Sequence, residues 1–214
     1  MKNSSSFLEA LKEPGQWLEQ NTTPLKSSRK LKAGIATLPD GQNIFVKRYY
    51  VPKLCPGITS VMIKKKVDRI MRISNHLLQA GVAVPKPYLV IRDFSVQRPS
   101  FFLVSQALQD VFFFRKALRQ NQVRGASGLT TLLNRIGENT GKMHKAGVVH
   151  RDLKGTNIMT GSDPDQPIYF IDFDAARRFN FPDNHIFALD LARLALEIAE
   201  NMPGPGVLQS LLSA

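Results

Sequence analysis

The chain has 214 residues, of which 43% are hydrophobic, and a single cysteine, Cys55. A chain of this length can bury one sizeable core, which we expect to be divided between two lobes. One cysteine excludes an internal disulfide framework. Lysine and arginine outnumber aspartate and glutamate by 29 to 17, for a formal charge of +12. No signal-peptide pattern or apolar run of membrane-spanning length is present, so we expect a cytoplasmic protein, peripheral at the cytoplasmic face of a membrane.

The first half of the chain is predicted to be an arm followed by a mixed lobe. Residues 1–24 are the expected N-terminal arm or helix, with Trp17 as its anchor, and residues 25–104 are the expected N-lobe. Within this lobe the turn pair Asp40-Gly41 is typical of a hairpin that joins two strands between residues 25 and 50. Apolar residues at helical spacing predict a helix near residues 61–80, and strands are predicted at 88–91 and 101–104.

The second half, residues 105–214, is predicted to be the C-lobe, reached through a hinge at residues 105–108. The aromatic run at residues 111–114 is expected to pack in the core rather than against lipid. A helix ending at Gly147 is predicted from an apolar face formed by Leu129, Leu132, Leu133, Ile136, Thr140 and Met143. Strands at 158–159 and 168–171 should flank a turn at 163–165. A last helix should start near Asn184 and bury Phe187, Leu191, Leu194 and Ile198.

Two motifs in the second half carry the chemistry. Residues 150–157 read H-R-D-L-K-G-T-N and residues 171–174 read I-D-F-D. This order and spacing is that of a protein-kinase-like phosphoryl-transfer site. A lone H-R-D is usually a surface loop and I-D-F-D could be a strand end, but the second motif follows at the required distance. The fold class predicted is therefore α+β, a two-lobed protein-kinase-like fold with a shortened C-terminal lobe.

Each polar residue of the motifs has an expected role. Asp152 would be the catalytic base, which accepts the proton of the acceptor hydroxyl. Asn157 and Asp172 would supply the hard oxygen ligands that Mg²⁺ prefers while it bridges the phosphates of ATP. Lys154 would place its ammonium group on the transferring phosphate. His150 and Arg151 are expected to brace the loop rather than to react.

A lysine for the α- and β-phosphates of ATP is expected on a strand of the N-lobe. Lys47 lies in the β-rich, aromatic stretch at residues 44–50 and fits this role. The alternatives are that Lys47 is an ordinary solvated strand lysine or that the neighbouring Arg48 takes the role. In this architecture the adenine edge usually meets backbone groups of the hinge, so Gln106 and Leu108 are candidate nucleotide-binding residues.

Two parts of a protein-kinase site are altered. The first hairpin lacks G-x-G-x-x-G, and its loop region is rich in lysine, arginine and serine, so backbone N–H groups and cations would hold the phosphates. The glutamate that normally pairs with the phosphate-binding lysine is also missing, because no glutamate occurs between Lys47 and Asp110. Asp68 is the remaining carboxylate on the predicted helix. It is the candidate partner of Lys47, although a surface pair with Arg72 is the alternative.

The sequence resembles the bacterial lipopolysaccharide core kinase family, whose members phosphorylate Kdo or heptose sugars of the inner core. The similarity lies in residues 45–49, 80–87, 143–154 and 171–177, within a stretch from Leu25 to Ala199. The resemblance implies ATP and Mg²⁺ as cofactors and gives Lys47, Asp152, Asn157 and Asp172 the nucleotide, base and metal roles. Asp174 occupies the position of the glycine in D-F-G, which this family tolerates, whereas the missing helix glutamate departs from the family pattern.

The acceptor is expected to be a sugar hydroxyl. Residues 173–214 contain no A-P-E motif of the kind that helps a protein kinase to dock a peptide. The segment after I-D-F-D leads almost directly into the last helix, which suits a lipopolysaccharide core sugar or another anionic glycolipid. On this helix Asp190 could brace the catalytic loop or simply favour the helix dipole.

Basic clusters at residues 26–32, 64–72 and 115–124 could hold this acceptor at the inner membrane. Such surfaces attract anionic lipids. They would attract nucleic acid equally well, although nucleic acid is not the expected partner, and ordinary solvated helix faces are the plain alternative. A small atypical Ser/Thr protein kinase and a weakly active nucleotide-binding scaffold are the competing functions.

Overall fold

The computed structural model describes residues 14–38, 40–53, 55–94, 99–119, 125–161, 166–180 and 184–201. The first 13 residues of the predicted arm and the predicted turn at 163–165 lie outside this part of the chain. The chain divides into two compact units, residues 1–75 with 85–108 and residues 76–84 with 109–214. The sequence placed the division after residue 104, whereas the contacts place it after Leu108 and assign the segment from His76 to Val84 to the second unit.

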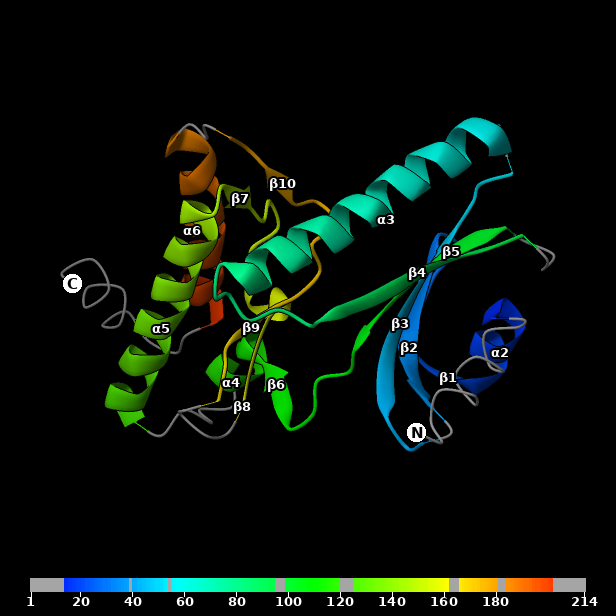
Figure 1. Ribbon diagram of the computed structural model, residues 1–214. Helices are drawn as coiled ribbons and strands as arrows, with labels where there is room; N and C mark the ends of the chain where they lie inside the picture. Colours follow the sequence, from blue (N-terminus) through cyan, green and yellow to red (C-terminus); the bar gives the residue numbers. More distant parts are fainter. Residues whose placement is uncertain are drawn as a thin grey trace. The chain divides into compact units, whose positions relative to one another are not determined.

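An antiparallel sheet with the strand order β1-β2-β3-β5-β4 forms the first unit (Figure 1). Its strands are β1 (Thr22–Ser27), β2 (Leu31–Thr37), β3 (Asn43–Tyr50), β4 (Pro87–Asp93) and β5 (Ser100–Gln106). The hairpin predicted around Asp40-Gly41 is confirmed, since β2 pairs with β3 from Leu31↔Tyr49 to Thr37↔Asn43. Gly41 has a φ of 84°, which a residue without Cβ adopts at no steric cost, and its N–H donates to the Leu38 carbonyl at 2.9 Å.

Two helices cover the sheet of the first unit. The short helix α2 (Pro14–Asn21) inserts Leu18 and the partly buried Trp17 into the cluster of Ala36, Leu38, Ile44, Val46, Phe102 and Val104. The helix α3 (Pro56–Gln79) lies on the opposite side of the sheet in Figure 1, where Lys66 stacks over the ring of Tyr49 at 4.9 Å. Because side chains alternate along a strand, neighbouring residues of β3 therefore face different helices.

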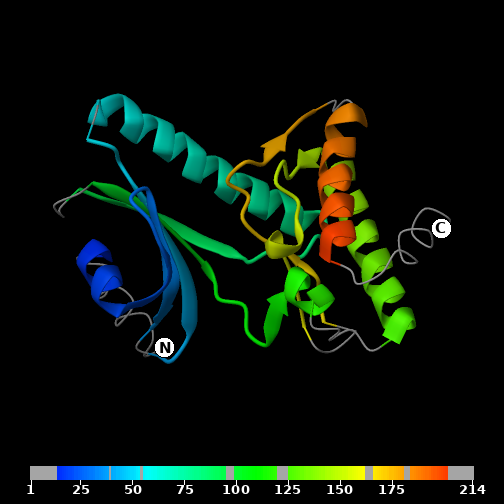
Figure 2. The same cartoon turned by 180° about the vertical axis from the view of Figure 1, so that it is seen from behind.

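The second unit combines helices with short strands. It contains α4 (Phe114–Arg119), α5 (Gly125–Lys145) and α6 (Asn184–Asn201), and α5 and α6 lie side by side in both views (Figure 2). Short strands fill the rest: β6 (Val111–Phe113), β8 (Ile158–Gly161) and β9 (Tyr169–Phe170) form one sheet, and β7 (Val148–Val149) pairs with β10 (Arg177–Arg178). The helix α5 ends as predicted, because Gly147 has a φ of 74° and donates its N–H to the His144 carbonyl.

Three local expectations hold only in part. The strand β5 continues through Gln106, so the predicted hinge at 105–108 begins two residues too early. In α6, Leu194 and Ile198 are buried as expected, but Leu191 is 48% exposed, and the face that points inward includes Asp190. Of the aromatic run, Phe114 is fully buried whereas Phe113 is 43% exposed. In α6, periodicity could not separate the buried from the exposed leucines, because the inward face of this helix is partly polar. Among the described helices, none has the length and hydropathy of a membrane span.

Candidate active site

The loop that follows β7 begins with a buried histidine that ties the two motifs together. The Nε2 atom of His150 lies 2.9 Å from the carbonyl oxygen of Ile171, so this nitrogen must carry the proton and donate. The ring packs against Phe173, with centroids 5.0 Å apart. Burial lowers the pKa of His150, because the charged imidazolium would lose its hydration. His150 is therefore a neutral structural residue, as its predicted bracing role requires.

Asp190 of α6 holds the backbone of the same loop. Its two carboxylate oxygens accept hydrogen bonds from the backbone N–H groups of His150 and Arg151, each at 2.7 Å. Asp190 is completely buried, and His144 lies 3.3 Å from it. Of the two alternatives for Asp190, the contacts favour the brace over the dipole. Arg151 has a φ of 65°, an unfavourable value for a side chain of this size, which these contacts stabilise.

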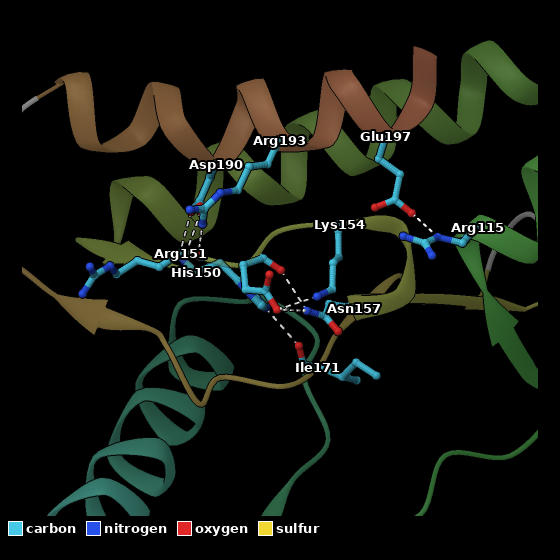
Figure 3. Close-up of polar contacts among 10 residues, drawn as sticks. Arg115, His150, Arg151, Lys154, Asn157, Ile171, Asp190, Arg193 and Glu197 are labelled. Atoms are coloured by element: carbon cyan, nitrogen blue, oxygen red, sulfur yellow. Dashed lines mark hydrogen bonds and ion pairs between the residues drawn. The ribbon is translucent and has the colours of Figure 1, made fainter. Parts of the chain in front are cut away.

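Two predicted site residues of the loop contact the predicted base, Asp152. They are Lys154, the predicted phosphate cation, and Asn157, the predicted metal ligand. The ammonium group of Lys154 is 2.8 Å from the Asp152 carboxylate. The amide nitrogen of Asn157 donates to the same carboxylate oxygen at 3.1 Å and to the Asp152 carbonyl at 2.8 Å. Lys154 and Asn157, labelled in Figure 3, thus reach this carboxylate from two points of the loop. The one-turn 3₁₀ helix at Gly155–Asn157 produces this geometry, because it turns the chain back toward Asp152.

Asp172, the aspartate of the second motif, opens into the same pocket as Asp152. This pocket has a volume of ≈ 390 Å³. Its lining residues are Arg151, Asp152, Asp172, Asp174, Ala175 and Arg193. Asp172 is exposed and has a φ of 65°, which aspartate tolerates better than most residues. The pocket therefore combines carboxylates with two guanidinium groups.

The donor set of this pocket fits Mg²⁺. Both hydrogen bonds of the Asn157 amide use its nitrogen, so its side-chain oxygen can serve as a hard ligand. The Asp172 carboxylate, which lines the pocket, is a second oxygen ligand. No group of three or more His, Cys, Asp or Glu ligands occurs among the described residues. Mg²⁺ does not need one, since it commonly takes one or two carboxylates and completes its shell with water and phosphate oxygens.

Lys47 and Arg48, the two alternatives for the phosphate cation, lie on opposite faces of β3. Arg48 is 5% exposed and donates to the Ser100 hydroxyl at 3.0 Å. It also forms an ion pair with Glu19 of α2 at 3.2 Å and stacks over the Phe102 ring. Lys47 lies on the α3 side with Tyr49, whose ring centroid is 5.6 Å from its ammonium group. Arg48 therefore makes structural contacts within the first unit, and Lys47 is the better candidate for the phosphate cation.

The remaining nucleotide residues are placed as follows. Asp68 forms an ion pair with Lys64 at 2.6 Å, one turn earlier on α3, and not with Arg72. The pairing of Lys47 with Asp68 stays a prediction. Gln106 ends β5 and donates its backbone N–H to the Lys86 carbonyl at 2.9 Å, and its contact with adenine stays a prediction. Leu108 is half-buried at the end of the first unit, and its role also stays a prediction.

Sequence reasoning missed two polar residues on the face of α6 that carries Asp190. Arg193 donates to the carbonyl oxygen of Arg151, and Glu197 forms a charged hydrogen bond with Arg115 of α4, which raises the pKa of Arg115. A Cβ on Gly155 would lie 3.1 Å from Glu197 and from the backbone nitrogen of Arg115, so Arg115 and Glu197 pack closely against the 3₁₀ turn. The spacing of residues 190, 193 and 197 places them on one face of a helix, and this pattern could have indicated that Arg193 and Glu197 lie beside Asp190.

Comparisons with known proteins identify the family of this chain. The model of the lipopolysaccharide kinase (Kdo/WaaP) family matches residues 43–203. Two 3-deoxy-D-manno-octulosonic acid kinases from strains of Vibrio vulnificus are each 30% identical over 108 residues, which are 46% of this chain and 39% of theirs. A probable bifunctional tRNA threonylcarbamoyladenosine biosynthesis protein of Methanothermobacter thermautotrophicus is 31% identical over 132 residues, 61% of this chain and 20% of its own.

The chain thus spans less than half of the length of the curated relatives that it matches. Among solved structures, that of WaaP in complex with acyl carrier protein is similar with a TM-score of 0.68 and 19% identity, over 95% of this chain and 82% of that one. This likeness confirms the predicted kinase-like α+β fold. Because the family model covers most of its length, the chain belongs to the lipopolysaccharide kinase (Kdo/WaaP) family.

Proposed function

We propose that this protein is an ATP- and magnesium-dependent kinase that transfers the γ-phosphate to a sugar hydroxyl of the lipopolysaccharide inner core. The observation that carries the proposal is the convergence of Lys154 and Asn157 on the Asp152 carboxylate, in a pocket shared with Asp172. Family membership supports the same chemistry.

The roles follow from the geometry of the second unit. Asp152 would accept the proton of the acceptor hydroxyl, and the Asn157 amide holds the carboxylate in place for this. Lys154, at 2.8 Å from Asp152, would offset charge on the transferring phosphoryl group. Asn157 and Asp172 would hold magnesium, which supplies neutralisation of phosphate charge when bound. Lys47 would contact the α- and β-phosphates from β3.

The sugar acceptor is supported by the curated relatives and by the short segment between Asp174 and α6. The Vibrio vulnificus relatives are named as kinases of a sugar acid, 3-deoxy-D-manno-octulosonic acid. After Asp174, only a short segment that includes β10 precedes α6. A peptide-docking platform of the protein-kinase kind has no counterpart among the described residues there. Since the acceptor is an anionic glycolipid, we place the enzyme at the cytoplasmic face of the inner membrane.

Transfer to purified core glycolipid, compared with transfer to generic proteins, tests the proposal. Radiolabelled ATP should label the glycolipid, and Asp152→Asn should serve as the inactive control. Mass spectrometry of core glycolipid from cells with and without the gene gives the cellular counterpart. Labelling of protein serines with an unchanged core would favour the protein-kinase alternative, and ATP binding without any turnover would favour the scaffold.

A further inference from the structure

We infer that Arg193, together with Arg151, binds an anionic group of the acceptor sugar, a carboxylate or a phosphate, beside the hydroxyl that Asp152 deprotonates. The inference rests on the proposed function and adds the acceptor chemistry to it. Its starting point is that the pocket of ≈ 390 Å³ around Asp152 and Asp172 is lined by two guanidinium groups that the proposed reaction does not use.

Arg193 is suited to this role by its position on α6. It lies on the same face of the helix as Asp190 and Glu197, which are buried, yet Arg193 itself is exposed at the pocket. One terminal nitrogen of Arg193 donates to the Arg151 carbonyl, as Figure 3 shows. A guanidinium has five N–H donors, so this contact fixes the group while other donors stay available. Its planar fork matches both carboxylate and phosphate.

Arg151 presents a second guanidinium from the catalytic loop. Its backbone is held in a left-handed conformation by Asp190 through the N–H and by Arg193 through the carbonyl. Its side chain points away from Asp190 in Figure 3, and no ion pair joins it to a carboxylate within the described residues. Unfavourable backbone conformations of this kind cluster at functional sites. Here the conformation keeps a positively charged side chain at the pocket.

The position of the base assigns the anion to the acceptor rather than to ATP. A general base must lie within hydrogen-bond reach of the hydroxyl that it deprotonates, so the acceptor must enter the pocket that Asp152 lines. Lys154 already places a cation 2.8 Å from the Asp152 carboxylate, where the transferring phosphoryl group would be. Arg193 and Arg151 are additional positive charges at the acceptor's position.

The test compares the free acid and the methyl ester of a 3-deoxy-D-manno-octulosonic acid glycoside as acceptors for the full-length protein. The wild type should prefer the acid by about tenfold to a hundredfold in kcat/KM, the range that one charge-assisted hydrogen bond supplies. Arg193→Gln should lose this preference, so that its kcat/KM for the acid falls to its value for the ester. Arg193→Lys should keep part of the preference. Arg178→Gln removes an exposed arginine that does not line the pocket and should keep all of it.

A phosphorylated core glycoside whose carboxylates are esterified distinguishes the two anions. If Arg193→Gln lowers the kcat/KM for this phosphorylated glycoside, the site binds phosphate. If Arg193→Gln lowers the kcat/KM for the free acid alone, the site binds carboxylate. Equal losses on acid and ester, accompanied by slower background ATP hydrolysis, would make Arg193 a positioning residue and overturn the inference. So would a wild type that distinguishes neither the acid from the ester nor the phosphorylated glycoside from its unphosphorylated counterpart. A wild type that phosphorylates no sugar would instead refute the proposed function itself, and this inference with it.

Discussion

The side-chain amide nitrogen of Asn157 lies 3.1 Å from the carboxylate of Asp152 and 2.8 Å from its carbonyl oxygen. One residue thus fixes the proposed base and, through its remaining oxygen, offers a ligand to a cation. Removing either function should leave a distinct signature, because the base acts on the acceptor and the metal ligands act on ATP. The first two predictions use this difference.

Asp172→Ala should abolish stabilisation by Mg-ATP. The variant lacks the carboxylate that would hold magnesium, so the charge of the triphosphate stays uncompensated. In the wild type, ligand at 100-fold above its dissociation constant should add about 2.7 kcal/mol to the free energy of unfolding. Thermal-shift measurements with and without magnesium check this, with Glu138→Ala on the exposed face of α5 as a control. An undiminished shift in Asp172→Ala would remove it from the metal site.

Asp152→Asn should keep ATP binding and suppress transfer. The substitution preserves the shape of the side chain but removes the group that accepts the proton. Loss of a general base typically slows a reaction about 10²-fold to 10⁴-fold. Single-turnover transfer to the core glycolipid measures the chemical step, and the thermal shift with Mg-ATP confirms that the site is intact. Turnover within a few-fold of wild type would place the base elsewhere.

Lys47→Met and Arg48→Met should have opposite consequences although the residues are adjacent. Arg48→Met leaves the buried Ser100 hydroxyl without its partner and should destabilise the protein by about 1–3 kcal/mol. Lys47→Met should raise the KM for ATP, because it removes the cation that is expected to contact the α- and β-phosphates. Urea unfolding and ATP kinetics on both variants check the pair. A double-mutant cycle with Asp68→Ala on activity would reveal whether Lys47 and Asp68 act together.

The stability of the protein should depend on His150 in mildly acidic solution. Its folded pKa is lowered below the ordinary value of 6.5 by burial. As the pH falls, His150 therefore takes up a proton in the unfolded chain before it does so in the folded protein. The contribution of neutral His150 to the free energy of unfolding is thus fully present above pH 6.5, and it is lost as the pH falls toward the folded pKa. Urea unfolding from about pH 8 to about pH 5 should show this slope. His150→Phe keeps the packing on Phe173 without a titrating group, and an equally steep slope in this variant would contradict the assignment.

Binding to anionic vesicles should require the first half of α3. Ile58, Val61 and Met62 are 67%, 54% and 64% exposed at helical spacing, beside Lys64 and Lys65. Apolar side chains flanked by lysine suit a lipid interface. Charge reversal of residues 64–66 should weaken binding and glycolipid phosphorylation more than ATP binding. Salt should do the same, since screening contracts from about 10 Å at 0.1 M to about 3 Å at 1 M.

The leucines of α6 provide the matched control for this surface. Leu189 and Leu196 are 59% and 62% exposed, fractions similar to those of the apolar side chains on α3. Substituting both by serine should leave vesicle binding unchanged. Loss of binding in this variant, with normal binding after charge reversal on α3, would move the membrane contact to α6.

The parts of the site that the sequence predicted are those held by local geometry. Asp152, Lys154 and Asn157 lie within six residues, and a 3₁₀ turn brings them together without help from distant segments. The hairpin of β2 and β3 could also be predicted from the sequence, because Asp40-Gly41 specifies its turn. Such features depend on spacing alone.

The contacts that the sequence did not predict join segments far apart in the chain. Nothing in the strand around Arg48 indicates that it reaches Ser100 and Glu19 rather than a phosphate. Arg193 is one arginine among many in a basic chain, and its contact with Arg151 depends on how α6 packs. Asp68 forms its ion pair with Lys64 rather than with Arg72, a choice between helical neighbours that the pattern leaves open, and its pairing with Lys47 stays a prediction.

The brace between Asp190 and the catalytic loop also constrains when the site can form during synthesis. The N–H groups of His150 and Arg151 precede their acceptor by 40 and 39 residues. At about 5–20 residues per second, the ribosome needs about 2–8 s to make this interval. Throughout that time the strained residue Arg151 has no acceptor to hold it. A nascent chain must therefore wait for α6 before its catalytic loop can take the native form, even when the whole first unit has already folded.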